Sequence, residues 1–106
     1  MVAQRAVTMD DIRRFVKAVK GQGIHLRHAY LFGSFARGTH SESSDVDIAL
    51  VADEFVGVSF EDIKWFIDLT IRPAYFGFEF HTFNTADFEK GDPFVDEIKR
   101  TGIEIG

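Results

Sequence analysis

The run from Val46 to Ala52, VDIALVA, constrains the fold most, because its second half is continuously apolar. A strand of this kind is buried on both faces of its sheet, which requires a covering layer on each side. Two acids, Asp45 and Asp47, stand one residue apart at its start. Since side chains alternate along a strand, both acids point to one face, about 6.5 Å apart along the chain. The sequence therefore predicts a buried strand that begins with a carboxylate pair.

The remainder of the chain alternates helical and strand patterns. Apolar spacing and capping signals predict helices over 8–20, 34–38, 59–72 and 93–102. Thr8 can cap the first of them, and Thr85 can cap a short helical turn over 86–90. In the helix over 59–72, the predicted buried residues are Ile63, Phe66, Ile67 and Ile71. Further strands are predicted over 26–32 and 76–83, and a polar loop over 39–44. We expect one α/β (α+β) domain over residues 1–106, with a small mixed sheet of three or more strands flanked by helices.

Bulk composition narrows the classes of function. The formal net charge of −5 argues against an extensive nucleic-acid surface, which needs lysine and arginine to neutralise phosphates. The absence of cysteine excludes disulfides and thiolate metal sites. No apolar stretch approaches the roughly 20 residues of a membrane span, and the first residues lack a signal peptide, so we expect a cytoplasmic protein. Twelve phenylalanines leave room for an exposed apolar face.

The acid pair suits a metal ion that takes only oxygen ligands, because Mg2+ is usually held by one or two carboxylates, waters and substrate phosphates. The alternative is a solvent-facing turn at the end of the strand. Glu79 and His81 share one face of the strand over 76–83, and three phenylalanines occupy the other. Because phenylalanines flank Glu79, we expect it near the core, where an acid needs a partner.

If this strand lies beside the first, Glu79 approaches the acid pair. Like charges about 4 Å apart repel by about 4 kcal/mol at an effective dielectric near 20, so such a cluster needs a cation or a proton. The alternative for Glu79 is a surface residue that pairs with a lysine. We interpret His81 as an ordinary strand histidine, with a role in orienting the acids as the alternative.

A Gly-Ser pair, Gly33 and Ser34, lies between the strand over 26–32 and the short helix. Backbone N–H groups at such a helix start can bind phosphate, and glycine lets a ligand approach closely. Arg37 could meet a phosphate or cover the surface, and Gly38 fits a chain reversal. Alone, the pair would predict only a turn.

Together these motifs resemble the signature of the nucleotidyltransferase superfamily, typified by DNA polymerase beta and kanamycin nucleotidyltransferase. That signature is a Gly-Ser at a helix start, an acid-x-acid strand and a third acid on a later strand. The string GSFARGTHSESSDVDIALV is similar to that of the minimal nucleotidyltransferases, in which Ala36, Arg37, Gly38, Ser44 and Ile48 also fit. The resemblance implies a polymerase beta-like fold.

The resemblance also implies roles. Asp45, Asp47 and Glu79 would be the catalytic residues and the ligands of two Mg2+ ions. Gly33, Ser34, Arg37 and Ser44 would bind the substrate, ATP or another nucleoside triphosphate. Glu79 stands where many relatives have Asp. The reaction would be attack at the α-phosphate with pyrophosphate leaving.

Minimal nucleotidyltransferases are commonly paired with helical proteins of the HEPN type in toxin–antitoxin systems, and several add AMP to a tyrosine of that partner. The resemblance therefore implies a nucleotidyltransferase antitoxin with a HEPN-type partner that completes the site, because the chain stops soon after the catalytic core. The alternative is a non-catalytic antitoxin that neutralises a helical toxin by binding alone. Transfer to a small antibiotic is a third hypothesis, and a homo-oligomer stays open.

Overall fold

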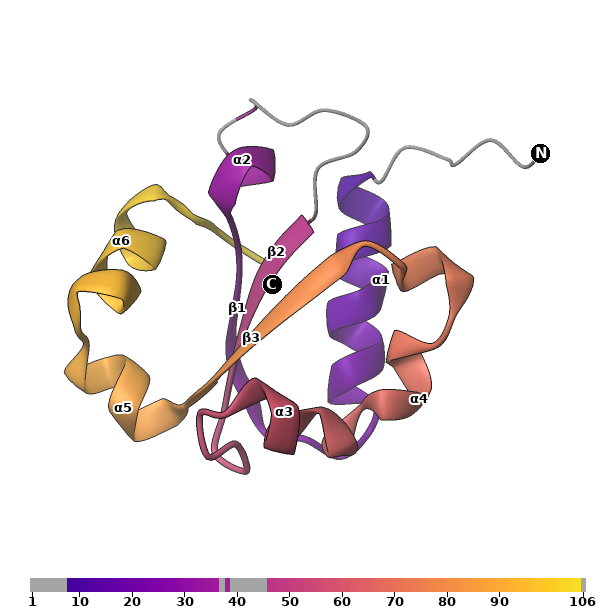
Figure 1. Ribbon diagram of the computed structural model, residues 1–106, viewed down its shortest axis with the longest axis horizontal. Helices are drawn as coiled ribbons and strands as arrows, with labels where there is room; N and C mark the ends of the chain where they lie inside the picture. Colours follow the sequence, from indigo (N-terminus) through magenta and orange to yellow (C-terminus); the bar gives the residue numbers. More distant parts are fainter. Residues whose placement is uncertain (1–7, 37, 39–45, 106) are drawn as a thin grey trace.

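The centre of the molecule is a mixed four-stranded sheet with the strand order β3-β2-β1-β4 (Figure 1). This computed structural model describes residues 8–36, 38 and 46–105. The strands are β1 (Leu26–Phe32), β2 (Val46–Ala52), β3 (Phe78–Asn84) and β4 (Ile103–Glu104). β1 pairs antiparallel with both β2 and β4, whereas β2 and β3 are parallel. The predicted fold class, a small mixed sheet flanked by helices, is confirmed.

Helix α1 (Met9–Lys20) covers one face of the sheet. Its start is fixed by a capping box, in which the Thr8 hydroxyl accepts from the Asp11 N–H and the Asp11 carboxylate accepts from the Thr8 N–H. The buried residues of the helix follow the predicted spacing and are Ile12, Phe15, Val16 and Val19. They pack against the β2 side chains that alternate toward this face, which are Val46, Ile48 and Leu50.

Helices α5 (Thr85–Lys90) and α6 (Pro93–Thr101) cover the opposite face (Figure 1). Ala49 and Val51 of β2 pack there against Phe88, Val95 and Ile98. Residues 48–52 of β2 are therefore inaccessible from either side, which confirms the burial predicted from the apolar run. None of the helices in the described ranges is long and apolar enough to cross a membrane.

The single helix predicted over 59–72 is wrong. This segment consists of α3 (Ser59–Asp62), a 3-10 turn η1 (Ile63–Trp65) and α4 (Ile67–Thr70), followed by η2 (Pro73–Tyr75). The predicted apolar face holds only in its first half: Phe66 is buried and Ile63 packs against the core, but Ile67 and Ile71 are exposed and Leu69 is buried instead. The break at η1 rotates the second half of the segment, so that helical spacing no longer holds across it.

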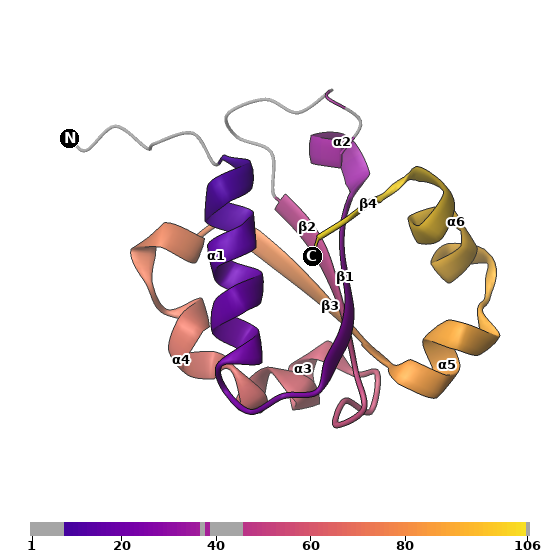
Figure 2. The ribbon, with the colours of Figure 1, turned by 180° about the vertical axis from the view of Figure 1, so that it is seen from behind.

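Three smaller boundaries also differ from the prediction. The third strand begins at Phe78, and Phe76 ends the preceding turn and is exposed. Asn84, not Thr85, caps α5 by accepting from the Ala86 N–H. β4 was not predicted; it adds two residues to the free edge of β1 (Figure 2). The predicted polar loop over 39–44 lies outside the described residues.

Candidate active site

Asp47, the second residue of β2, pairs with Glu79 of β3 on one side and with Phe32 of β1 on the other. Directly paired residues project to the same face of a sheet, so Asp47 and Glu79 lie side by side as predicted. The face is the one that α5 and α6 cover, because the neighbours of Asp47 in β2, Val46 and Ile48, point toward α1. Asp45, the other member of the predicted pair, lies outside the described residues.

Glu79 is exposed, with 55% of its side chain accessible, so the predicted position near the core is wrong. Its neighbours Phe78 and Phe80 pack on the α1 face against Phe15. Side chains alternate along a strand, and the two phenylalanines therefore report the burial of the opposite face only. Glu79 itself lies at the open end of the sheet beside Asp47.

His81 completes the group of polar side chains at this end of the sheet. Its Nε2 lies 3.5 Å from Asp47 Oδ1 and 3.9 Å from Glu79 Oε1. The Nε2 atom is buried and has no hydrogen-bond partner. The structure thus brings to the acids a residue interpreted from sequence as an ordinary strand histidine. Its spacing of two residues from Glu79 was the signal that could have assigned it to the site.

One donor atom from each of Asp47, Glu79 and His81 lies within 4.8 Å of the other two. Two ligands about 2.1 Å from an octahedral ion lie roughly 3 Å apart when adjacent and 4.2 Å apart when opposite. The two contacts of His81 Nε2 fall within that span, and rotation of the exposed Glu79 side chain can adjust the rest. The donor set fits a divalent cation: its two carboxylates suit Mg2+, and its imidazole suits transition metals.

Gly33 begins α2 (Gly33–Ala36) next to the carboxylate of Asp47. Its φ is +74°, and a Cβ built at this position would overlap Asp47 Oδ2. The glycine therefore permits the start of α2 to approach the acid. Ser34 is the second residue of α2, as expected for a Gly-Ser pair at a helix start. Arg37 and Ser44, the other predicted nucleotide contacts, lie outside the described residues.

A hollow of about 200 Å³ adjoins this end of the sheet. Its lining residues come from the end of β1, the start of α2 and one side of α6, and they are Phe32, Gly33, Phe94, Glu97, Ile98 and Thr101. Phe32 and Phe94 also contact the ring of His81, at centroid distances of 5.0 and 6.1 Å. Two residues that line the hollow, Phe32 and Phe94, thus also contact His81 of the polar group.

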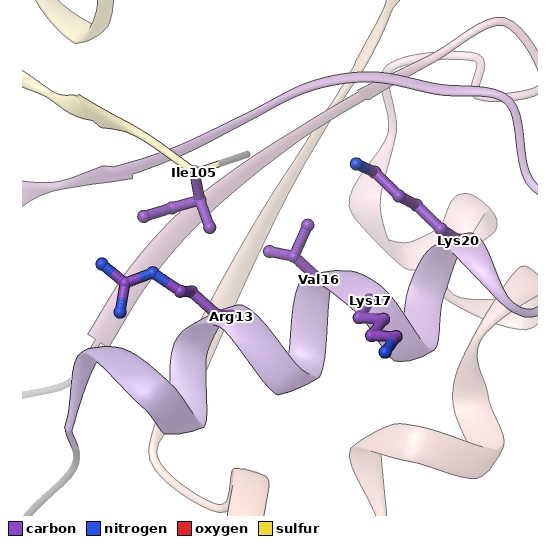
Figure 3. Close-up of a pocket in the computed structure, with 5 residues that line it drawn as sticks. All are labelled: Arg13, Val16, Lys17, Lys20 and Ile105. Carbon is purple, nitrogen blue, oxygen red and sulfur yellow. The ribbon is translucent and has the colours of Figure 1, made fainter.

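A second hollow, of about 290 Å³, lies between α1 and Ile105 (Figure 3). Val16 forms its floor together with Ile105, and Arg13, Lys17 and Lys20 line it from α1. Its positive charge suits an anion. However, α1 covers the face opposite to Asp47, so this hollow is separated by the sheet from the polar group.

Two carboxylates with lowered pKa values lie at the other end of the hairpin formed by β1 and β2. A hydrogen bond and charge from the Arg27 guanidinium lower the pKa of Asp53 to about 2. For Glu54, burial raises the pKa, but hydrogen bonds from His25 outweigh it and hold the value below its usual range. Both residues follow the end of β2, away from Asp47 at its start, and we assign them a structural role.

Comparison with known proteins gives a family and a fold. A curated protein of Methanocaldococcus jannaschii, named "putative protein adenylyltransferase", is 44% identical over 62 residues. This match covers 58% of the chain and 55% of the relative, so the chain spans about half the length of the curated relative it matches.

Two solved structures have the same fold. A "putative nucleotidyltransferase" from Sulfolobus solfataricus superimposes with a TM-score of 0.60 at 21% identity, over 98% of this chain and 89% of that one. A toxin–antitoxin structure with AMP-PNP gives a TM-score of 0.57 at 18% identity, over 87% of this chain and 70% of that one. The nucleotidyltransferase domain model matches residues 12–103, which is most of the chain. The resemblance predicted from the Gly-Ser and acid-x-acid motifs is therefore confirmed, and this chain belongs to the nucleotidyltransferase domain family.

Proposed function

We propose that this chain is an Mg2+-dependent enzyme that transfers AMP from ATP to a hydroxyl group of a partner protein. The observation that carries the proposal is the register that sets Asp47 opposite Glu79, beside the glycine that begins α2. Membership of the nucleotidyltransferase domain family supports the reaction class. The name of the M. jannaschii relative, a protein adenylyltransferase, supports AMP and a protein acceptor.

Asp45, Asp47 and Glu79 would hold a pair of Mg2+ ions, which when bound neutralise the triphosphate and lower the pKa of the attacking hydroxyl. The Gly33 and Ser34 backbone at the start of α2 lies beside Asp47 and would hold the phosphates. By their positions in the motif, Arg37 and Ser44 would contact the nucleotide. Most of the catalysis is positioning and charge neutralisation, so no covalent enzyme intermediate is needed.

In the reaction the acceptor oxygen attacks the α-phosphorus in line with the bond to the β-phosphate. The new phosphorus–oxygen bond joins AMP to the acceptor, and the bond between the α-phosphorus and the bridging oxygen breaks, so pyrophosphate leaves. Glu79 has the most exposed side chain of the three residues around the site and can accept the hydroxyl proton. The Asp47 carboxylate lies next to Gly33 and His81, and these neighbours fix its position in the site.

The partner would be a helical protein of the HEPN type, which AMP transfer would silence, so that this chain acts as an antitoxin. The toxin–antitoxin neighbour with AMP-PNP supports this pairing at the level of the fold. Exposed apolar side chains in the segment between β2 and β3 offer a surface for such a protein; Phe60 is 88% accessible and Ile71 is 70% accessible.

The test is to incubate the purified chain with a HEPN-type RNase from the same organism, together with Mg2+ and each nucleoside triphosphate in turn. We expect an AMP adduct on a partner hydroxyl, detected by mass spectrometry, and loss of the partner's RNase activity. Asp45→Asn and Asp47→Asn should abolish both effects, and Glu89→Gln, at an exposed position of α5 away from the site, should abolish neither. If Asp47→Asn still neutralises the partner without any adduct, the chain acts by binding alone.

A further inference from the structure

We propose that His81 Nε2 is a metal ligand of this site, and that the site therefore binds Mn2+ more tightly than Mg2+. The inference rests on the proposed metal-dependent function and adds to it a nitrogen ligand and an order of metal preference. Three observations carry it: the position of the imidazole, its distances to the two carboxylates, and the shorter distances at which His25 and His28 contact their carboxylates.

The ring of His81 is held in place by aromatic contacts. Phe32 packs against it edge to face, and Phe94 contacts it from α6. In the sheet, His81 pairs with Ala49 of β2, whose small side chain leaves space over the strand. The result is an imidazole whose Nε2 lies near both Asp47 and Glu79 and has no hydrogen-bond partner.

The distances distinguish this histidine from a simple ion-pair partner. His25 Nδ1 lies 2.5 Å from a Glu54 oxygen, and His28 Nδ1 lies 2.8 Å from a Glu104 oxygen, both within hydrogen-bond range. His81 Nε2 instead stays 3.5 and 3.9 Å from its two carboxylate oxygens. Separations of that size are long for hydrogen bonds and lie between the spacings of adjacent and opposite ligands on one octahedral ion, so small side-chain rotations would bring both oxygens and Nε2 onto a shared ion.

The chemistry of the donor set then decides the preference. Mg2+ is hard, keeps several waters and takes oxygen ligands, so an imidazole adds little to its binding. First-row transition ions bind imidazole well, and Mn2+ accepts both carboxylate and imidazole. A site with two carboxylates alone would differ little in its affinity for Mg2+ and Mn2+. A site that also offers His81 Nε2 stabilises Mn2+ selectively.

The test uses the intact chain and the metals alone, without nucleotide. Pulsed electron paramagnetic resonance of bound Mn2+ reports directly whether a nitrogen nucleus is coordinated. We expect nitrogen coupling in the wild type and none in His81→Phe, a change that keeps an aromatic ring between Phe32 and Phe94 but removes the nitrogens. His28→Phe is the matched control and should keep the coupling.

Calorimetric titration gives the second readout. His81→Phe should weaken Mn2+ binding by about tenfold or more and leave Mg2+ binding nearly unchanged. Absence of nitrogen coupling in the wild type, which requires no variant to fold, would overturn the inference. So would equal Mn2+ affinity in wild type and His81→Phe. In either of those cases, if Asp47→Asn still abolishes binding, the proposed function survives; if Asp47→Asn has no effect on either ion, the proposed metal site fails as well.

Discussion

Gly33 combines two features that forbid a side chain: a φ of +74° and a close approach to Asp47 Oδ2. In Gly33→Ala, the backbone conformation costs about 1–2 kcal/mol, and the new Cβ must displace the Asp47 carboxylate. We expect both lower stability and loss of AMP transfer, measured by urea unfolding and by mass spectrometry of the partner.

Gly23→Ala is the matched control for this change. Gly23 has a φ of +83°, and a Cβ there meets nothing within 4 Å. It should lose a similar amount of stability and keep AMP transfer. The assignment of Gly33 to the site is wrong if the two alanine variants transfer AMP equally well.

Sequence reasoning anticipated Asp47 and Glu79 better than it anticipated His81. Alternation along a strand is a local property, so the face of each acid could be read from its neighbours. The contact between His81 and Asp47 depends on the register of β2 against β3 and on the rotamer of His81. Neither can be predicted from the sequence of one segment alone. The exposure of Glu79 was misjudged because flanking phenylalanines were taken as its own surroundings.

Asp53 provides a prediction about pH at the far end of the hairpin. The Arg27 guanidinium lies 2.5 Å from Asp53 Oδ2 and lowers the pKa of Asp53 from 3.8 to about 2. A carboxyl with a lower pKa in the folded state stabilises the protein above its unfolded value, and this contribution is lost as pH falls from about 4 to about 2. Thermal melts should therefore show a smaller decrease in Tm over that pH range for Asp53→Asn than for wild type. If Asp53→Asn and wild type lose Tm equally over this pH range, the ion pair with Arg27 does not contribute to acid stability.

At the scale of elements, Asp62 joins the segment between β2 and β3 to the sheet. Its buried carboxylate accepts hydrogen bonds from the Val56 and Gly57 N–H groups and from the Thr82 hydroxyl. Three donors aimed at one acid at the end of α3 fix the position of the loop before this helix.

Asp62→Ala should destabilise the fold by about 1–3 kcal/mol, because it leaves the buried Thr82 hydroxyl and two part-buried N–H groups without this partner. Urea unfolding followed by circular dichroism measures this loss. Asp68→Ala, at an exposed site on α4, should change the stability by less than about 0.5 kcal/mol. Equal effects of the two substitutions would show that the Asp62 hydrogen bonds do not hold the loop.

The sequence predicted elements well where one local pattern controls them, and poorly where tertiary contacts do. The helix cap at Thr8 and the apolar run in β2 are local, and both were predicted. The carboxylate of Asp62, where α3 ends, accepts a hydrogen bond from Thr82, twenty residues away along the chain, and no local pattern reveals such a contact. β4 has only two residues and exists because β1 offers it an edge, so no periodicity could reveal it.

At the scale of the whole molecule, the site depends on the topology of the sheet. Asp47 and Glu79 lie near the start of two parallel strands, and Gly33 follows the end of an antiparallel one. Parallel pairing requires the crossover over residues 53–77, which packs Phe66, Leu69 and Tyr75 into the core on the α1 face. The crossover thus holds the two acidic strands side by side, and changes at its buried residues Phe66, Leu69 and Tyr75 should alter the stability of the fold more than the chemistry of the site.

A ligand that binds only the folded state links this site to global stability. With free nucleotide at about ten times its Kd, the stabilisation is about 1.4 kcal/mol, which raises the Tm of a domain this size by about 6–11 °C. We expect that rise for ATP with Mg2+, measured by thermal melts, and no rise for Asp47→Asn or after chelation of the metal.

The same melts with GTP, CTP and UTP show which nucleotide base the protein prefers. Asp47→Asn, melted with the same nucleotides, is the control for binding at this site. A response confined to ATP would support AMP as the transferred group. A flat wild-type response to all four nucleotides would mean that the acids opposite each other in β2 and β3 do not form a working site. An equal rise in wild type and Asp47→Asn would place the bound nucleotide elsewhere, and the basic hollow along α1 is then the surface whose charge could hold it.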